Sequence, residues 1–186
     1  QFKVTYYCEK RDPDFDSKMH NVLVIYKQVS LQFDKDGNLL PFEGTPVHTL
    51  SYDEKPGIQA IGSTTPDLPP ISNTEKGSSY MRDYEYIRYG TISLLAAIDL
   101  LTGEAIPLVS DTHKSSDFVE FLTRLDAKYP EGDKIRLILD NHSAHTSQET
   151  QRYLNNHLGR FEFVFTPTHG FWLNLVDCLL YTSDAA

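Results

Sequence analysis

The stretch "IRLILDNHSAHT", residues 135–146, is an apolar run that ends in an acid, followed by Asn, His, Ser and a second His. An apolar run over 135–140 is typical of a strand buried on both faces, as in the parallel sheets of α/β proteins. Open α/β sheets bind their ligands beyond the carboxyl ends of such strands. Asp140 is therefore a candidate functional residue, although an Asp after a strand is also an ordinary turn former or helix cap.

The segments around this strand predict an α/β fold. Strands joined through helices tend to be parallel and a tight turn makes a pair antiparallel, so we expect a central mixed five-stranded sheet flanked by helices. Residues 62–90 are rich in Pro, Ser, Gly and Tyr and predict a long ordered loop. The expected helices cover 14–30, 115–130 and 146–158, with a last one opening in 166–177; the expected strands cover 47–53, 91–99, 105–109, 135–140 and 160–165.

A second acid, Asp53, ends the strand over 47–53, which we expect to stop at Pro56-Gly57. If the two strands lie side by side, the carboxylates of Asp53 and Asp140 repel each other unless they share a cation, and oxygen ligands suit Mg²⁺ or Mn²⁺. A third acid, Asp177, follows in the first turn of the last expected helix. Three such carboxylates can hold two divalent ions ~4 Å apart, the arrangement that serves phosphodiester chemistry.

Composition narrows the class of protein. The chain has 186 residues and 40% hydrophobic content, enough for one compact domain. A net charge of −9 argues against a protein that coats nucleic acid without specificity. No apolar stretch reaches the ~20 residues of a membrane span, no signal peptide is evident, and Cys8 and Cys178 form no metal-binding pattern. We therefore expect a soluble cytoplasmic protein with free thiols.

Three motifs carry a family resemblance. The segments "SYDEKPGIQA" (51–60), "LILDNHSAH" (137–145) and "FTPTHGFWLNLVD" (165–177), in this order, resemble the DDE transposases of bacterial insertion sequences, in the branch akin to mariner elements. The resemblance covers roughly residues 1–177. It implies a ribonuclease H-like fold with the first and fourth strands adjacent, and a clamp over 56–90 that helps to assemble a homodimer on DNA.

The resemblance also implies a site. Asp53, Asp140 and Asp177 match the three catalytic acids of the family, which hold two Mg²⁺ or Mn²⁺ ions there and of which the third is usually Glu. Further residues are assigned supporting roles, each with a plainer alternative: Asn141 and His145 orient Asp140, a water or a phosphate, or cap a helix; Glu54 supports a ligand or is an exposed acid; Lys55, Arg82 and Arg88 contact DNA or are solvated charges.

The implied activity is DNA cleavage at the inverted-repeat ends of an element, followed by joining of the freed 3′ hydroxyl to target DNA, in the bacterial cytoplasm at the nucleoid. The alternatives are a ribonuclease H-like nuclease or resolvase, and an inactive remnant that only binds DNA or a partner subunit. We expect a linker helix and turn region over 1–45 and a catalytic domain over 46–177. We also expect truncation at both ends, because an upstream helix-turn-helix region is absent and the tail 178–186, "CLLYTSDAA", reads like a translated sequencing adaptor.

Overall fold

The computed structural model describes residues 12–41, 44–69 and 80–176. Asp177, the tail 178–186, Cys8 and Cys178 lie outside the described residues, so the expectations for them stay predictions, as does the division of the chain at residue 45. Within the described ranges, no helix is both long enough and apolar enough to cross a membrane.

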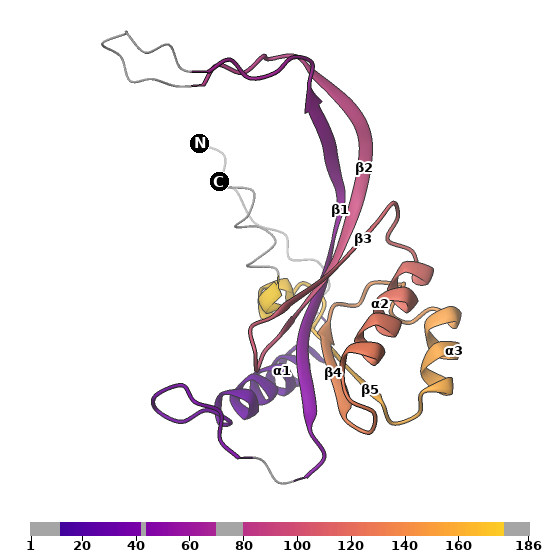
Figure 1. The fold of residues 1–186 in the computed structure, drawn as a ribbon. Coiled ribbons are helices and arrows are strands. Elements are labelled where there is room, and N and C mark those ends of the chain that lie inside the picture. Colours follow the sequence, from indigo (N-terminus) through magenta and orange to yellow (C-terminus); the bar gives the residue numbers. More distant parts are fainter. Residues whose placement is uncertain (1–11, 42–43, 70–79, 177–186) are drawn as a thin grey trace, which may run out of the picture.

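A five-stranded sheet forms the centre of the molecule (Figure 1). The strands are β1 (Val47–Ser63), β2 (Tyr86–Asp99), β3 (Ala105–Ser110), β4 (Lys134–Leu139) and β5 (Phe161–Phe165), in the spatial order β3-β2-β1-β4-β5. The pairs β1–β2 and β2–β3 are antiparallel, whereas β4 is parallel to both β1 and β5. The mixed sheet and the adjacency of the first and fourth strands are confirmed.

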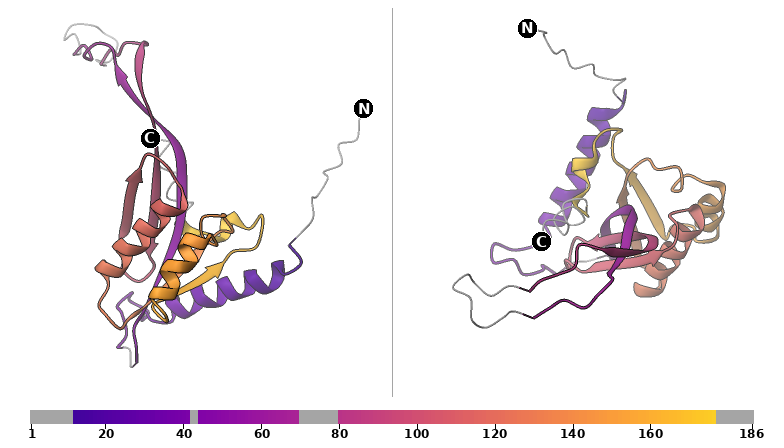
Figure 2. Two further views of the ribbon diagram at one scale, coloured as in Figure 1. Left: turned by 90° about the vertical axis from the view of Figure 1, so that its right-hand side faces the viewer. Right: turned by 90° about the horizontal axis from the view of Figure 1, so that it is seen from above.

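Helices cover both faces of the sheet (Figure 2). On one face, α2 (Ser115–Lys128) contributes Phe118, Phe121 and Leu122 to the main core, and α3 (Gln148–Asn156) lies beside it. On the other face, α1 (Phe15–Ser30) packs Val22 and Ile25 against the sheet. Leu137 and Leu139 of β4 face the α2 side and Ile138 faces the α1 side, which explains why this strand is apolar throughout.

The first strand is longer than its sequence predicts. The register of β1 with β2 shifts between Lys55 and Ile58, so a β-bulge absorbs the Pro-Gly pair that was expected to stop the strand. Gly57 takes a left-handed conformation there, with φ of 71°. Residues 58–63 and 86–92 consequently form a two-stranded antiparallel ribbon, called the arm below, which stands away from the sheet (Figure 1). Part of the expected loop over 62–90 is therefore strand.

The helix ends also differ slightly from expectation. The helix expected over 146–158 begins only at Gln148, because the Ser147 hydroxyl accepts a hydrogen bond from the backbone N–H of Thr150 at 3.2 Å. In the third motif, a short 3₁₀ helix, Phe171–Leu173, comes first, and α-helical residues begin at 175 and continue to 176, where the described residues end. The helix expected to open within 166–177 thus begins near the end of that range.

Candidate functional site at the ends of β1 and β4

The register of β1 and β4 brings two of the expected acids together. The last pair of the parallel ladder is Ser51 with Ile138. Two residues further along each strand are Asp53 and Asp140, so these residues are neighbours at the carboxyl ends of adjacent strands. Both are partly exposed. This is the edge of an α/β sheet at which ligands bind.

The third motif is attached to β1 next to Asp53. The Ser51 hydroxyl donates a hydrogen bond to the Asn174 side-chain oxygen and accepts one from the backbone N–H of Val176 at 3.1 Å. The Asn174 side-chain nitrogen donates to the Tyr52 carbonyl at 2.6 Å. These contacts hold residues 174–176 against Ser51 and Tyr52 of β1. Asp177 is the next residue and lies outside the described ranges.

The loop after β4 is tied to the end of β5. The Asn141 side-chain amide donates to the Thr166 carbonyl at 2.7 Å, and the Asp140 carboxylate accepts a hydrogen bond from the backbone N–H of His142 at 2.9 Å. Asn141 thus joins two strand ends, a positioning contact. A cleft of about 350 Å³ lies beside this loop, lined by Asp140, Asn141, His142, Thr166, Pro167, Thr168, His169 and Gly170.

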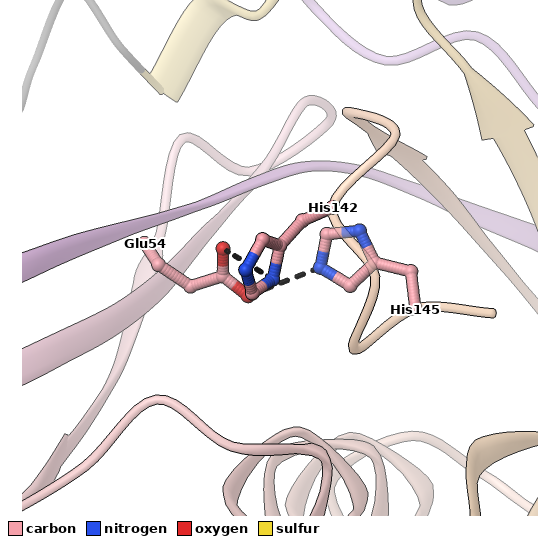
Figure 3. A group of neighbouring side chains, drawn as sticks. All are labelled: Glu54, His142 and His145. Atoms are coloured by element: carbon pink, nitrogen blue, oxygen red, sulfur yellow. Dashed lines mark hydrogen bonds and ion pairs between the residues drawn. The ribbon is translucent and has the colours of Figure 1, made fainter. Parts of the chain in front are cut away.

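Glu54 and His145 form a buried pair behind Asp140 (Figure 3). His145 is 1% exposed, and its Nε2 lies 3.0 Å from Glu54 Oε1. Its Nδ1 lies 3.0 Å from the Asp140 carbonyl oxygen and 3.3 Å from Asp140 Oδ1. The Tyr52 hydroxyl donates to Glu54 Oε1 at 2.8 Å. His145 therefore connects Glu54 in β1 to Asp140 after β4.

Burial and pairing act in opposite directions on this pair. Burial raises the pKa of Glu54, but the hydrogen bond and charge of His145 outweigh it, so that the pKa lies below its usual value. Burial lowers the pKa of His145, but Glu54 and then Asp140 outweigh it and hold the pKa above its usual value. Burial, followed by the nearby Glu54, raises the pKa of Tyr52. The hydroxyl of Tyr52 therefore stays a donor to Glu54.

His142 was assigned no role from the sequence. Its Nδ1 is buried without a hydrogen-bond partner in the described part of the chain, and it lies 3.8 Å from Glu54 Oε2. One ligand atom each from Glu54, His142 and His145 lie within 4.8 Å of one another. The sequence shows two histidines three residues apart. Glu54, the third member of this cluster, lies 88 positions before His142, and no sequence pattern connects it to them.

The expected DNA-contacting residues lie in different surroundings. Lys55 is on β1 beside the bulge, two residues from Asp53. Arg82 is 73% exposed and pairs with Asp67, with its Nη2 2.7 Å from the carboxylate. Arg88 lies over the Tyr86 ring in the arm, 5.5 Å from the ring centroid. The structure therefore brings Lys55 close to the acids and keeps Arg82 and Arg88 outside the site.

Comparisons with known proteins identify the family. Residues 63–181 match the model of the DDE superfamily endonucleases, a range that begins after Asp53 and includes Asp140. An uncharacterised 39 kDa protein of insertion element IS630 from Shigella sonnei is 33% identical over 86 residues, which are 46% of this chain and 25% of that protein. This chain therefore aligns with only a quarter of that curated relative.

Solved structures share the fold. The catalytic domain of Mos1 mariner transposase matches with a TM-score of 0.57 at 14% identity, over 99% of this chain and 74% of that chain. The Mos1 mariner paired end complex with Mn matches with a TM-score of 0.55 at 13% identity, over 100% of this chain and 52% of that chain. The fold is thus the ribonuclease H-like α/β fold, and the family match over more than half of its length shows that the chain belongs to the DDE superfamily endonucleases.

Proposed function

We propose that this chain is the catalytic region of a transposase that cuts DNA at the ends of an insertion element and joins the freed 3′ hydroxyl to target DNA. The observation that carries the proposal is the register of β1 and β4, which makes Asp53 and Asp140 neighbours at the carboxyl edge of the sheet. The family match, the IS630 relative and the Mos1 neighbours support it. A bacterial cytoplasmic location at the nucleoid follows from the same proposal.

The donor set fits divalent hard cations. Asp53 and Asp140, with Asp177, offer only carboxylate oxygens, and such ligands suit Mg²⁺ or Mn²⁺. A solved Mos1 relative is a complex with Mn. Two bound ions would supply activation of the attacking oxygen and stabilisation of the leaving oxygen in an in-line displacement. Asp53, Asp140 and Asp177 are accordingly the proposed catalytic residues.

The surrounding residues have proposed positioning roles. His145 contacts both the carbonyl and the carboxylate of Asp140, and Glu54 fixes the far side of the His145 ring. Asn141 holds the loop against β5. These contacts keep the Asp140 carboxylate beside Asp53 without rearrangement during the reaction, which is how preorganised sites gain rate.

Lys55, Arg82 and Arg88 are proposed to contact DNA phosphates. Lys55 is the best placed of the three for the reacting strand, because it lies two residues beyond Asp53 on the same strand. Arg82 would have to exchange its pairing with Asp67 for a phosphate, an exchange that surface ion pairs permit at small cost. Arg88, in the arm, would act further from the acids.

Nicking of DNA tests the proposed chemistry. We expect this chain to nick DNA that carries the element's inverted-repeat ends when Mg²⁺ is added, and Asp140→Asn to abolish nicking while end binding persists. Asp36→Asn, which replaces an exposed acid in the turn region after α1, is the matched control and should nick normally. Nicking that survives in Asp53→Asn together with Asp140→Asn would refute the choice of acids.

The same assay separates the alternatives. Nicking without transfer of the 3′ end to target DNA would indicate a nuclease or resolvase. Binding of end DNA without any nicking would indicate an inactive remnant. A homodimer on DNA is the finer part of the proposal, and the arm is its proposed contact surface, because Tyr84, Tyr86 and Tyr89 at and beside it are more than half exposed.

Removal of the arm tests its role in assembly. Residues 59–91 can be replaced by Asn-Gly, because Ile58 and Ile92 are cross-strand partners and a two-residue turn closes such a pair. We expect the shortened protein to remain folded and to lose DNA-dependent dimerisation, measured by light scattering with end DNA. Dimerisation of the shortened protein equal to that of the wild type would exclude the arm as the contact surface.

A further inference from the structure

The hydrogen on the His145 ring can be assigned from its partners. Nδ1 of His145 lies 3.0 Å from the carbonyl oxygen of Asp140, and a carbonyl oxygen only accepts hydrogen bonds. Nδ1 therefore carries a hydrogen. The other ring nitrogen, Nε2, faces Glu54 Oε1 at 3.0 Å. A carboxylate oxygen and a bare ring nitrogen are both acceptors, so a cation, either a proton or a metal ion, must lie between them.

A proton between His145 and Glu54 would leave a neighbouring group unsatisfied. His142 Nδ1 is buried, has no hydrogen-bond partner among the described residues, and lies 3.8 Å from the other oxygen of Glu54, too far for a hydrogen bond. Both histidine rings point toward the Glu54 carboxylate (Figure 3). A metal ion among the three groups would satisfy His142 as well as His145, because all three ligand atoms lie within 4.8 Å of one another.

We propose that Glu54, His142 and His145 form a binding site for a divalent transition metal of the zinc class, separate from the proposed carboxylate site. Two imidazole nitrogens and one carboxylate oxygen are a ligand set that zinc takes in proteins, with water in the fourth position, whereas Mg²⁺ prefers oxygen ligands. A zinc-ligating histidine usually donates its other ring N–H to a carbonyl or carboxylate, as His145 does to Asp140. This proposal does not depend on the proposed function.

The site lies on the face of β1 opposite to that of Asp53, because side chains alternate along a strand and Glu54 follows Asp53 directly. On this face, the rings of Phe118 and Tyr52 pack against His145, with centroids 4.6 and 5.5 Å from that of the imidazole. An ion here would join β1 to the loop after β4. Through His145 it would also fix the backbone of Asp140.

Metal binding by the whole chain tests the proposal. We expect the wild-type protein, freed of metal and then placed in excess Mg²⁺, to bind one Zn²⁺ per chain, and Co²⁺ to give the intense visible absorption of a four-coordinate nitrogen-containing site. His142→Ala should weaken Zn²⁺ binding by more than the roughly 100-fold that follows from loss of an outer ligand contact. Because the His142 side chain is 35% exposed and His145 is buried, replacing His142 disturbs folding less than replacing His145.

Two controls make the result specific. His113→Ala removes a histidine whose ring lies 6.1 Å from that of His142 but which is not in the proposed ligand set, and it should bind Zn²⁺ as the wild type does. Asp53→Asn should retain the Co²⁺ absorption. The proposal is overturned if the wild type gives no four-coordinate Co²⁺ absorption, if His142→Ala, shown by circular dichroism to be folded, binds Zn²⁺ as tightly as the wild type, or if Asp53→Asn abolishes the signal.

Discussion

The two halves of β1 belong to one strand but have different surroundings. Residues 49–52 are buried one after another, because β2 and β4 flank this half and helices cover both faces of the sheet. Residues 58–63, in the arm, alternate between partly exposed and exposed and pair only with β2. Both halves of β1 are paired with β2. Only the half that helices cover, residues 49–52, belongs to the hydrophobic core.

The difference has a consequence for stability. A two-stranded ribbon by itself is marginally stable in water, so the arm depends on its continuity with the sheet. Its large exposed side chains include Ile61 and Tyr89, which are 58% and 70% exposed. Segments with few buried contacts open locally at lower free energy than the core. The buried half holds the acids in place, while the arm offers a surface that can be changed at little cost to folding.

The largest expected effect lies at the buried half. Phe118 of α2 is fully buried, and its ring centroid lies 5.2 Å from that of Tyr52 in β1. Phe118→Ala should lower the free energy of unfolding by about 3–5 kcal/mol, because it leaves a cavity under the strand. Urea denaturation of the variant and the wild type measures the difference in the free energy of unfolding. Tyr84→Ala, at a side chain that is 89% exposed, is the control and should change it by less than about 0.5 kcal/mol. Equal costs for the two variants would contradict the distinction between the core and the exposed segment beside the arm.

The buried half could be predicted as a strand from sequence and the arm could not. The apolar run that ends at Asp140 indicates that β4 is central, because burial on both faces requires apolar residues on both. The segment VHTLSYD, which ends at Asp53, was predicted as a strand, but its polar residues gave no sign that it is buried on both faces. Pro56 and Gly57 are ordinary strand breakers, and only pairing with a distant segment, 86–92, allows β1 to continue past them through a bulge. Such pairing between remote residues leaves no local pattern.

The site divides in the same way. Asp53 and Asp140 follow from strand ends, whereas the assignment of His145 depended on the family resemblance, and for Glu54 the alternative of an exposed acid stayed open. Their contact joins residues 91 positions apart. The burial of His142 Nδ1 arises from the path of the loop after β4, a stretch without periodicity. Its role could not be predicted because a histidine in a polar loop is ordinarily exposed.

A smaller effect is expected where α2 begins, beside the covered half of the sheet. Asp117 accepts hydrogen bonds from the Ser110 hydroxyl at 3.0 Å, from the Thr112 hydroxyl and from the backbone N–H of Lys114 at 2.7 Å. Burial raises the pKa of Asp117, but these hydrogen bonds outweigh it and lower the pKa below its usual value. A carboxyl group with a lowered folded-state pKa stabilises the fold above its unfolded pKa and loses this contribution as pH falls through the folded value.

Asp117→Asn should therefore lower the free energy of unfolding by about 1 kcal/mol at neutral pH, a typical value for a helix-capping contact. The difference from the wild type should shrink once pH falls below the usual Asp pKa of 3.8, as urea titrations at a series of pH values would reveal. Glu120→Gln on the same helix is the matched control, because its pairing with Arg124 is exposed and contributes little. A difference that persisted unchanged in acid would show that the charge of Asp117 is irrelevant.

The smallest effect is expected in the arm itself. A Cβ added at Gly62 would lie 2.7 Å from Cε2 of the Tyr89 ring, so Gly62→Ala must displace that ring. The ring can move into solvent because Tyr89 is 70% exposed. The free energy of global unfolding should then change by less than about 0.5 kcal/mol, while hydrogen exchange of arm amides becomes faster.

A double variant sharpens this last prediction. If Gly62→Ala acts only by displacing the Tyr89 ring, it should speed hydrogen exchange of the arm amides less in a Tyr89→Ala background than in the wild type. The effects of two substitutions that act through one contact are not additive. A loss of more than about 2 kcal/mol in global stability from Gly62→Ala alone would be typical of a core position. The arm would then unfold together with the buried half of β1, and pairing along the strand, rather than coverage by helices, would set the limit of the cooperative unit.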